Sequence, residues 1–111
     1  MARTALAALA LALTAGCGIP ASTPGARLTF LPDPPAARRG ETLCASIAGS
    51  APPTAARVWM PGMPHPVTTT PLAPDGQGAS CGQVIFVMGG RWAVTLQGGD
   101  GSATVTVEVT E

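Results

Sequence analysis

Side chains that can bind a soft metal ion lie close together in one short segment of the sequence. Met60, Met63 and His65 are separated mainly by prolines, and Met88 is a further candidate later in the chain. Thioether sulfur selects Cu(I) among biological metals, and imidazole binds copper in either oxidation state. The prolines stiffen the segment, which lowers the entropy cost of presenting several ligands from one loop. These four residues are therefore a candidate Cu(I) site.

The same residues have an ordinary structural interpretation. Methionine often fills irregular gaps in a hydrophobic core, and Met60 and Met88 fall on the apolar faces of expected strands. A lone histidine between prolines is often a solvated loop residue. Copper binding and plain packing both remain open at the level of the sequence.

Few other residues offer catalytic chemistry. His65 is the only histidine, and the sequence contains neither Lys nor Tyr. The serines have no second base with which to form a nucleophilic triad. No glycine-rich loop stands between a strand and a helix to bind phosphate. We expect a protein that is not an enzyme.

The first residues have the pattern of a secretory signal. Arg3 precedes a run over 5–13 that contains only Ala and Leu, and this run is far shorter than the roughly 20 residues of a membrane-spanning helix. It is followed by Thr14-Ala15-Gly16-Cys17, which resembles the bacterial lipobox, where small residues precede a cysteine that is acylated and becomes the new N-terminus. We predict a lipoprotein signal peptide over 1–16 and a lipid on Cys17. The alternative is an ordinary signal peptide with an incidental cysteine.

Lipid on Cys17 would place the protein outside the cytoplasm, in the cell envelope and anchored to a membrane, because a diacyl anchor supplies the two chains that stable attachment requires. Residues 17–25 are rich in Pro, Ser, Thr and Gly, which predicts a lipidated cysteine followed by a flexible tether. Residues 26–111 are enough for one domain.

Two cysteines remain after Cys17, and an exported domain of this size has a small core. Cys44 and Cys81 lie in an oxidising compartment and form an even pair, so we predict a disulfide between them. Metal or redox thiols are the weaker alternative because no CxxC spacing and no clustered histidines are present.

The charge balance excludes one class of partner. Once the signal is removed, five of the six basic residues remain against six acidic ones, which gives a net charge of about −1. Five scattered arginines cannot form a basic face, so we expect no nucleic-acid binding.

Apolar residues recur at every second position along the mature chain, which is typical of half-buried β-strands. We expect Trp59 and Trp92 to be core aromatics, Gly89-Gly90 to form a hairpin turn into the Trp92 strand, and 98–101 to form another turn. The fold class is all-β, a small antiparallel immunoglobulin-like β-sandwich of about seven strands. The expected strands cover 26–30, 43–47, 56–60, 67–72, 82–88, 92–96 and 103–109.

Two segments together resemble a known family. Residues 58–65, VWMPGMPH, are similar to the Met-x-x-Met-x-His region of the YtkA-like and FixH-like β-sandwich domains. Residues 78–96, with Gly78, Met88, Gly90 and Trp92, resemble the glycine, apolar strand, Met, Gly and Trp of their signature, although Cys81 stands where an aromatic residue is usual. The resemblance implies a non-catalytic, exported accessory domain associated with copper handling or with the assembly of metal-containing membrane complexes.

Two functional hypotheses follow. One is a membrane-anchored accessory lipoprotein that binds Cu(I) through Met60, Met63, His65 and Met88. The other is an interaction module that docks on an envelope or membrane protein complex without a metal.

Overall fold

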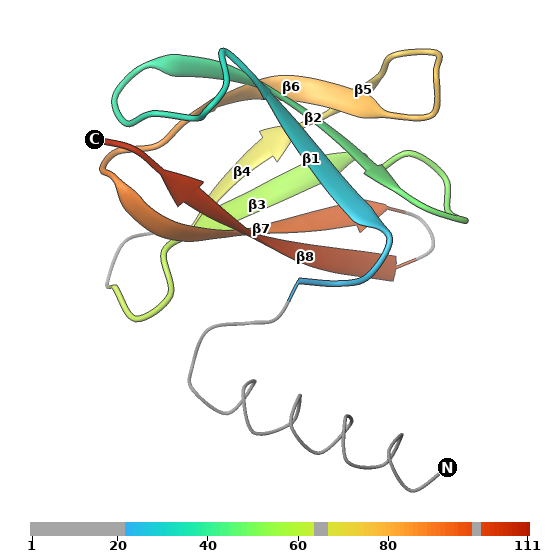
Figure 1. Cartoon of the computed structure of the whole chain (residues 1–111). Coiled ribbons are helices and arrows are strands. Elements are labelled where there is room, and N and C mark those ends of the chain that lie inside the picture. Colours follow the sequence, from blue (N-terminus) through green and yellow to red (C-terminus); the bar gives the residue numbers. More distant parts are fainter. Residues whose placement is uncertain (1–21, 64–66, 99–100) are drawn as a thin grey trace, which may run out of the picture.

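A computed structural model describes residues 22–63, 67–98 and 101–111 of the chain (Figure 1). These residues form eight strands and no helix, and every pair of neighbouring strands is antiparallel. Among them there is no helix long and apolar enough to cross a membrane. The strands are β1 (Ala26–Leu31), β2 (Gly40–Ile47), β3 (Ala55–Trp59), β4 (Thr68–Pro71), β5 (Ala73–Pro74), β6 (Ser80–Ile85), β7 (Gly90–Gly98) and β8 (Gly101–Val109).

The strands form two four-stranded sheets, which confirms the predicted all-β sandwich. One sheet has the order β1-β2-β6-β5 and the other has the order β4-β3-β7-β8. The predicted strand over 67–72 corresponds to β4 in the second sheet. It is followed by Leu72 and then by β5, which lies in the first sheet and was not predicted. The Leu72 N–H donates to the Thr54 carbonyl (2.9 Å) and fixes this corner.

The predicted hairpin at Gly89-Gly90 is wrong. β6 and β7 belong to different sheets, so residues 86–89 cross from one layer to the other. Phe86, which is fully buried, explains the crossing: its ring contacts Phe30 (centroid distance 5.9 Å) and Trp92 (5.3 Å) in the core. The second predicted turn is confirmed, because β7 and β8 pair from Gly98 and Gly101 onward.

The expectation for the two tryptophans is half right. Trp92 is buried in the core, and its indole N–H donates to the Met88 carbonyl (3.0 Å). Trp59 is only partly buried and alternates with buried Val58, so it lies on the outer face of its sheet. There it faces Ala93 in the β3–β7 register, and Ala93 is fully buried.

The predicted Cys44–Cys81 disulfide is present and joins neighbouring strands of one sheet. Cys44 faces Cys81 in the β2–β6 register with a Cα–Cα distance of 4.1 Å, which fits a non-hydrogen-bonded antiparallel pair. Cys44 alternates with buried Leu43 and Ala45, so the bridge lies on the outer face of the sheet. The sandwich therefore differs from antibody domains, whose disulfide joins the two sheets.

The free edge of β8 is covered by residues from distant parts of the chain. The hydroxyl oxygens of Ser22 and Thr23 accept the N–H groups of Thr106 and Thr104, both at 3.0 Å. Further along the edge, Ala37 donates to the Thr110 carbonyl (2.7 Å). Ser22 and Thr23 belong to the predicted tether, whereas the predicted signal peptide and Cys17 lie outside the described residues.

Candidate functional site

Met60 and Met63 lie in one turn that follows β3. The Met63 N–H donates to the Met60 carbonyl (3.2 Å), which closes the turn. Gly62 has a φ of 79°, a conformation that favours glycine. The sequence Met-Pro-Gly-Met thus holds two thioethers within one turn.

The Met60 side chain reaches the start of β7. A Cβ atom on Gly90 would lie only 2.9 Å from the Met60 methyl carbon, so this methyl group occupies the space that a side chain would fill. Met88 is two residues before Gly90 and packs, partly buried, against the core cluster that includes Met60. The structure therefore brings the turn after β3 and the 86–89 segment to one end of the sandwich, next to the C-terminus (Figure 1).

The three methionines differ in access to solvent. Met60 is 9% exposed and Met63 is 42% exposed. Packing is the main role of Met60, as its place in the core cluster shows. Met63 has no such role and is accessible to a ligand. His65, the fourth candidate, lies outside the described residues.

Glu111 makes polar contacts at this end of the molecule. The Glu111 carboxylate accepts the Gly89 N–H (2.9 Å) and the Arg38 guanidinium (3.0 Å). The Gly89 hydrogen bond first, and then Arg38, hold the pKa of Glu111 below its ordinary value. The C-terminal residue thereby connects the 86–89 segment to the loop between β1 and β2.

Glu41 is a buried carboxylate that the sequence reasoning missed. Its side chain is fully buried, accepts Arg39 Nε at 2.6 Å and the Ala36 N–H at 3.1 Å, and leaves Oε1 without a hydrogen bond. Arg39 also donates to the Pro34 carbonyl (2.9 Å). Glu41 therefore fixes the β1–β2 loop. The sequence signal for this burial was that Glu41 lies two residues before Leu43 and four before Ala45, on the same inward face of the strand.

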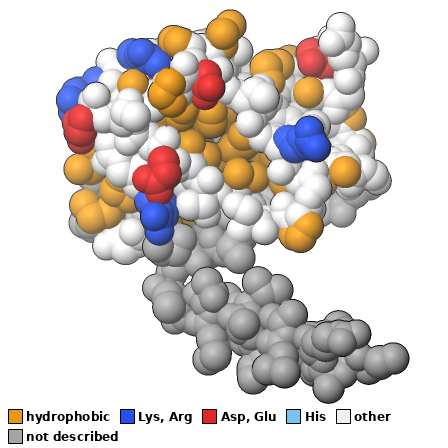
Figure 2. All heavy atoms as spheres, in the orientation of Figure 1, with side chains coloured by type: hydrophobic (Ala, Val, Ile, Leu, Met, Phe, Trp, Pro, Cys, Tyr) orange, Lys and Arg blue, Asp and Glu red, His pale blue; other side chains and the backbone are white. Residues whose placement is uncertain are grey.

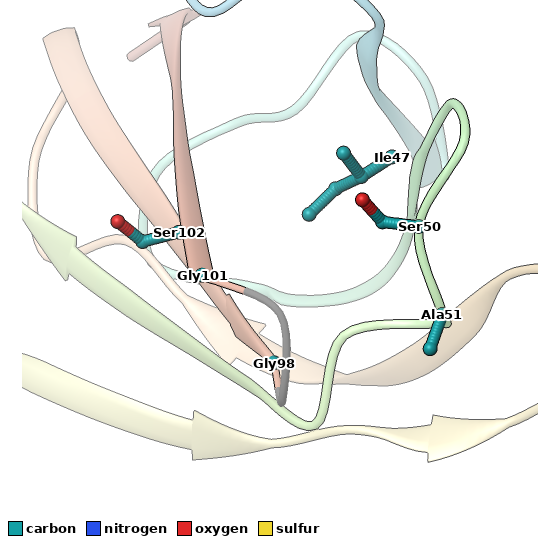
Figure 3. Close-up of a pocket in the computed structure, with 6 residues that line it drawn as sticks. All are labelled: Ile47, Ser50, Ala51, Gly98, Gly101 and Ser102. Carbon is teal, nitrogen blue, oxygen red and sulfur yellow. The ribbon is translucent and has the colours of Figure 1, made fainter.

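Two cavities formed by described residues have no methionine in their lining. One cavity, at the opposite end of the sandwich (Figure 3), has a volume of about 60 Å³, which is room for a few water molecules. An open groove of about 340 Å³ lies between Thr68 and Thr70 of β4 and the Gln83–Ile85 part of β6. The first cavity is lined by Ile47, Ser50, Ala51, Gly98, Gly101 and Ser102.

Within the described ranges, no three His, Cys, Asp or Glu side chains gather closely enough to hold a metal ion. The candidate ligand set rests on the methionine sulfurs and on His65. Comparison with protein-family models, with curated proteins and with solved structures finds no match to this chain.

Proposed function

We propose that this protein is an extracytoplasmic accessory lipoprotein, anchored to a membrane through Cys17, whose domain binds Cu(I) at the methionine-bearing end of the sandwich. The observation that supports copper binding is that the Met60 methyl group occupies the space beside Gly90, two residues from Met88, which packs against the same core cluster.

The ligands have different tasks in this proposal. Met63, which is exposed, is the thioether that meets the incoming ion, and His65 follows it by two residues. Met88 belongs to the 86–89 segment, and it packs against the apolar core cluster that includes Phe86 and Trp92. Soft sulfur ligands in an apolar surrounding favour Cu(I) over Cu(II). Met60 packs in the core, and its sulfur binds copper only after the side chain leaves the core.

Loss of one proposed ligand is expected to weaken Cu(I) binding by roughly tenfold or more, because each ligand in a three-coordinate site carries a large share of the affinity. The experiment is anaerobic competition against a chromogenic Cu(I) chelator with wild type, Met63→Leu, His65→Ala and Met88→Leu. Leucine keeps the apolar volume and removes the sulfur.

Val67→Ala is the matched control, because Val67 is 45% exposed and lies just beyond the same loop. We expect it to retain wild-type affinity. Equal retention by all four ligand-site proteins, or no retention by wild type, would contradict copper binding.

A second function, docking on an envelope protein complex without a metal, is supported by a different observation. Leu31, Ile85 and Val87 are 73%, 64% and 56% exposed. Leu31 and Ile85 alternate with inward-facing residues on β1 and β6, so both lie on the outer face of one sheet. Absence of copper binding would leave this docking function as the better interpretation.

Cys17→Ser is expected to shift the protein from the membrane fraction to the soluble or unprocessed pool, since serine cannot form the thioether bond to diacylglycerol. Mass spectrometry of the membrane fraction measures the lipid and the new N-terminus. An unmodified wild-type protein that begins at another residue would contradict lipidation.

A further inference from the structure

Three of the four sheet edges in the described part of the chain are short or covered. β8 is covered by Ser22, Thr23 and the loop that contains Ala37. β4 and β5 are only four and two residues long, and each ends in a proline. Short, proline-containing and covered edges do not pair with further strands. β1, with six residues, is the remaining edge.

The outward backbone groups of β1 follow from its pairing with β2. Ala48 donates to the Gly25 carbonyl (2.9 Å), so the odd-numbered residues of β1 exchange hydrogen bonds with β2 in this register. Leu28 and Phe30 therefore direct their N–H and C=O groups away from β2. Among the described residues these groups have no backbone partner, whereas the Ala26 N–H donates to the Thr23 carbonyl (3.3 Å).

We propose that β1 pairs with β1 of a second copy of this chain, antiparallel and centred on Thr29. In this register Leu28 faces Phe30 of the second copy and Phe30 faces Leu28, and the two pairs exchange about four hydrogen bonds. The two-fold axis passes between the two Thr29 residues. The pair joins two four-stranded sheets into one continuous sheet.

The side chains of β1 are self-complementary in this register. On the outer face, Thr29 meets Thr29 of the second copy, a pairing that forms cross-strand hydrogen bonds. Arg27 meets the exposed Leu31 of the second copy, so the aliphatic stem of the arginine covers the leucine and no like charges face each other. On the inner face, the second copy covers the partly buried Leu28 and Phe30.

The surface around this edge fits the proposal. Apolar side chains gather at the middle of the face on which β1 and β8 lie (Figure 2). Because the other edges are short or covered, the pairing closes at two copies instead of forming a chain of sheets. One six-residue strand is a small contact, so the dimer is weak and depends on concentration.

Charge exchange at Thr29 tests the proposal, because this side chain is exposed and lies at the two-fold axis. The protein is extracted from the membranes of the producing cells with detergent and studied by sedimentation equilibrium from about 10 μM to 1 mM. We expect wild type to dimerise, and Thr29→Lys and Thr29→Glu each to weaken the dimer by roughly tenfold or more. An equimolar mixture of the two variants should dimerise again.

Ser102→Lys is the control, because Ser102 is exposed on β8 and faces the uncharged Gln97. It should dimerise like wild type. Backbone amide exchange of wild type provides a second readout: protection of the Leu28 and Phe30 amides should rise with concentration. A monomer at every concentration, dimers of Thr29→Lys as strong as wild type, or concentration-independent exchange of the Leu28 and Phe30 amides would overturn the proposal.

Discussion

Replacement of Cys44 and Cys81 together by alanine is expected to lower the free energy of unfolding by about 4 kcal/mol. The bridge closes a loop across a sequence separation of 37 residues, and its loss returns that loop entropy to the unfolded chain. The bridge lies on the outer face of the sheet, so removal of its sulfurs opens no cavity in the core. Urea unfolding of wild type and of the double variant measures the difference.

Reduced wild type is the control for this measurement, since it lacks the bridge and keeps the sulfur atoms. We expect its midpoint to match that of the double alanine variant. A loss below about 1 kcal/mol for the double variant would show that the unfolded chain is already constrained between these strands.

Glu41→Ala is expected to lower the free energy of unfolding by about 2 kcal/mol, because it removes a charged hydrogen bond with Arg39 and leaves the Ala36 N–H without its acceptor. The cost is held down by two features: Arg39 is partly exposed and can bind water, and the unpaired Oε1 atom disappears. Thermal unfolding followed by circular dichroism measures the loss.

Two further variants separate the role of Glu41 from a general effect of charge. Glu41→Gln keeps an acceptor for Ala36 and should lose less than Glu41→Ala. Glu108→Ala breaks the ion pair with Arg91 (2.6 Å), whose side chains are 54% and 68% exposed for Arg91 and Glu108, and should change stability by less than about 1 kcal/mol. Equal losses for Glu41→Ala and Glu108→Ala would contradict a fixing role for Glu41.

Alternation of apolar and polar residues was enough to predict most strands. In β8, buried Ala103, Val107 and Val109 alternate with more exposed residues, as expected for a sheet with one face in the core. The same rule placed β2, β3 and β7. The same alternation implies that Trp59 lies on the outer face, because a strand that buries Ala56 and Val58 turns Trp59 to the other face.

Long-range arrangement was not predictable from such local patterns. Residues 67–72 read as one strand, and nothing in their sequence shows that Leu72 is a corner between two sheets. Likewise Gly89-Gly90 has the composition of a hairpin turn, and only the burial of Phe86 between Phe30 and Trp92 explains why the chain crosses layers there.

The candidate site was predicted in part. Proximity of Met60 and Met63 follows from the Pro61-Gly62 turn between them. The position of Met88 depends on the crossing between the two sheets at residues 86–89. The placement of the Met60 methyl group beside Gly90 depends on the β3–β7 pairing. The alternation of residues 56–60 placed Met60 on an apolar strand face and left Met63 outside the strand, in agreement with the buried Met60 and the exposed Met63.

The corner at Leu72 has a consequence for local opening of the sandwich. On this side the two sheets are joined covalently through a single residue between β4 and β5. On the other side, where β1 packs near β8, they are joined by hydrogen bonds from Ser22, Thr23 and Ala37. Separation of the layers costs least where no covalent link resists it. We therefore expect transient opening of the native state to begin between β1 and β8, on the side away from the Leu72 corner.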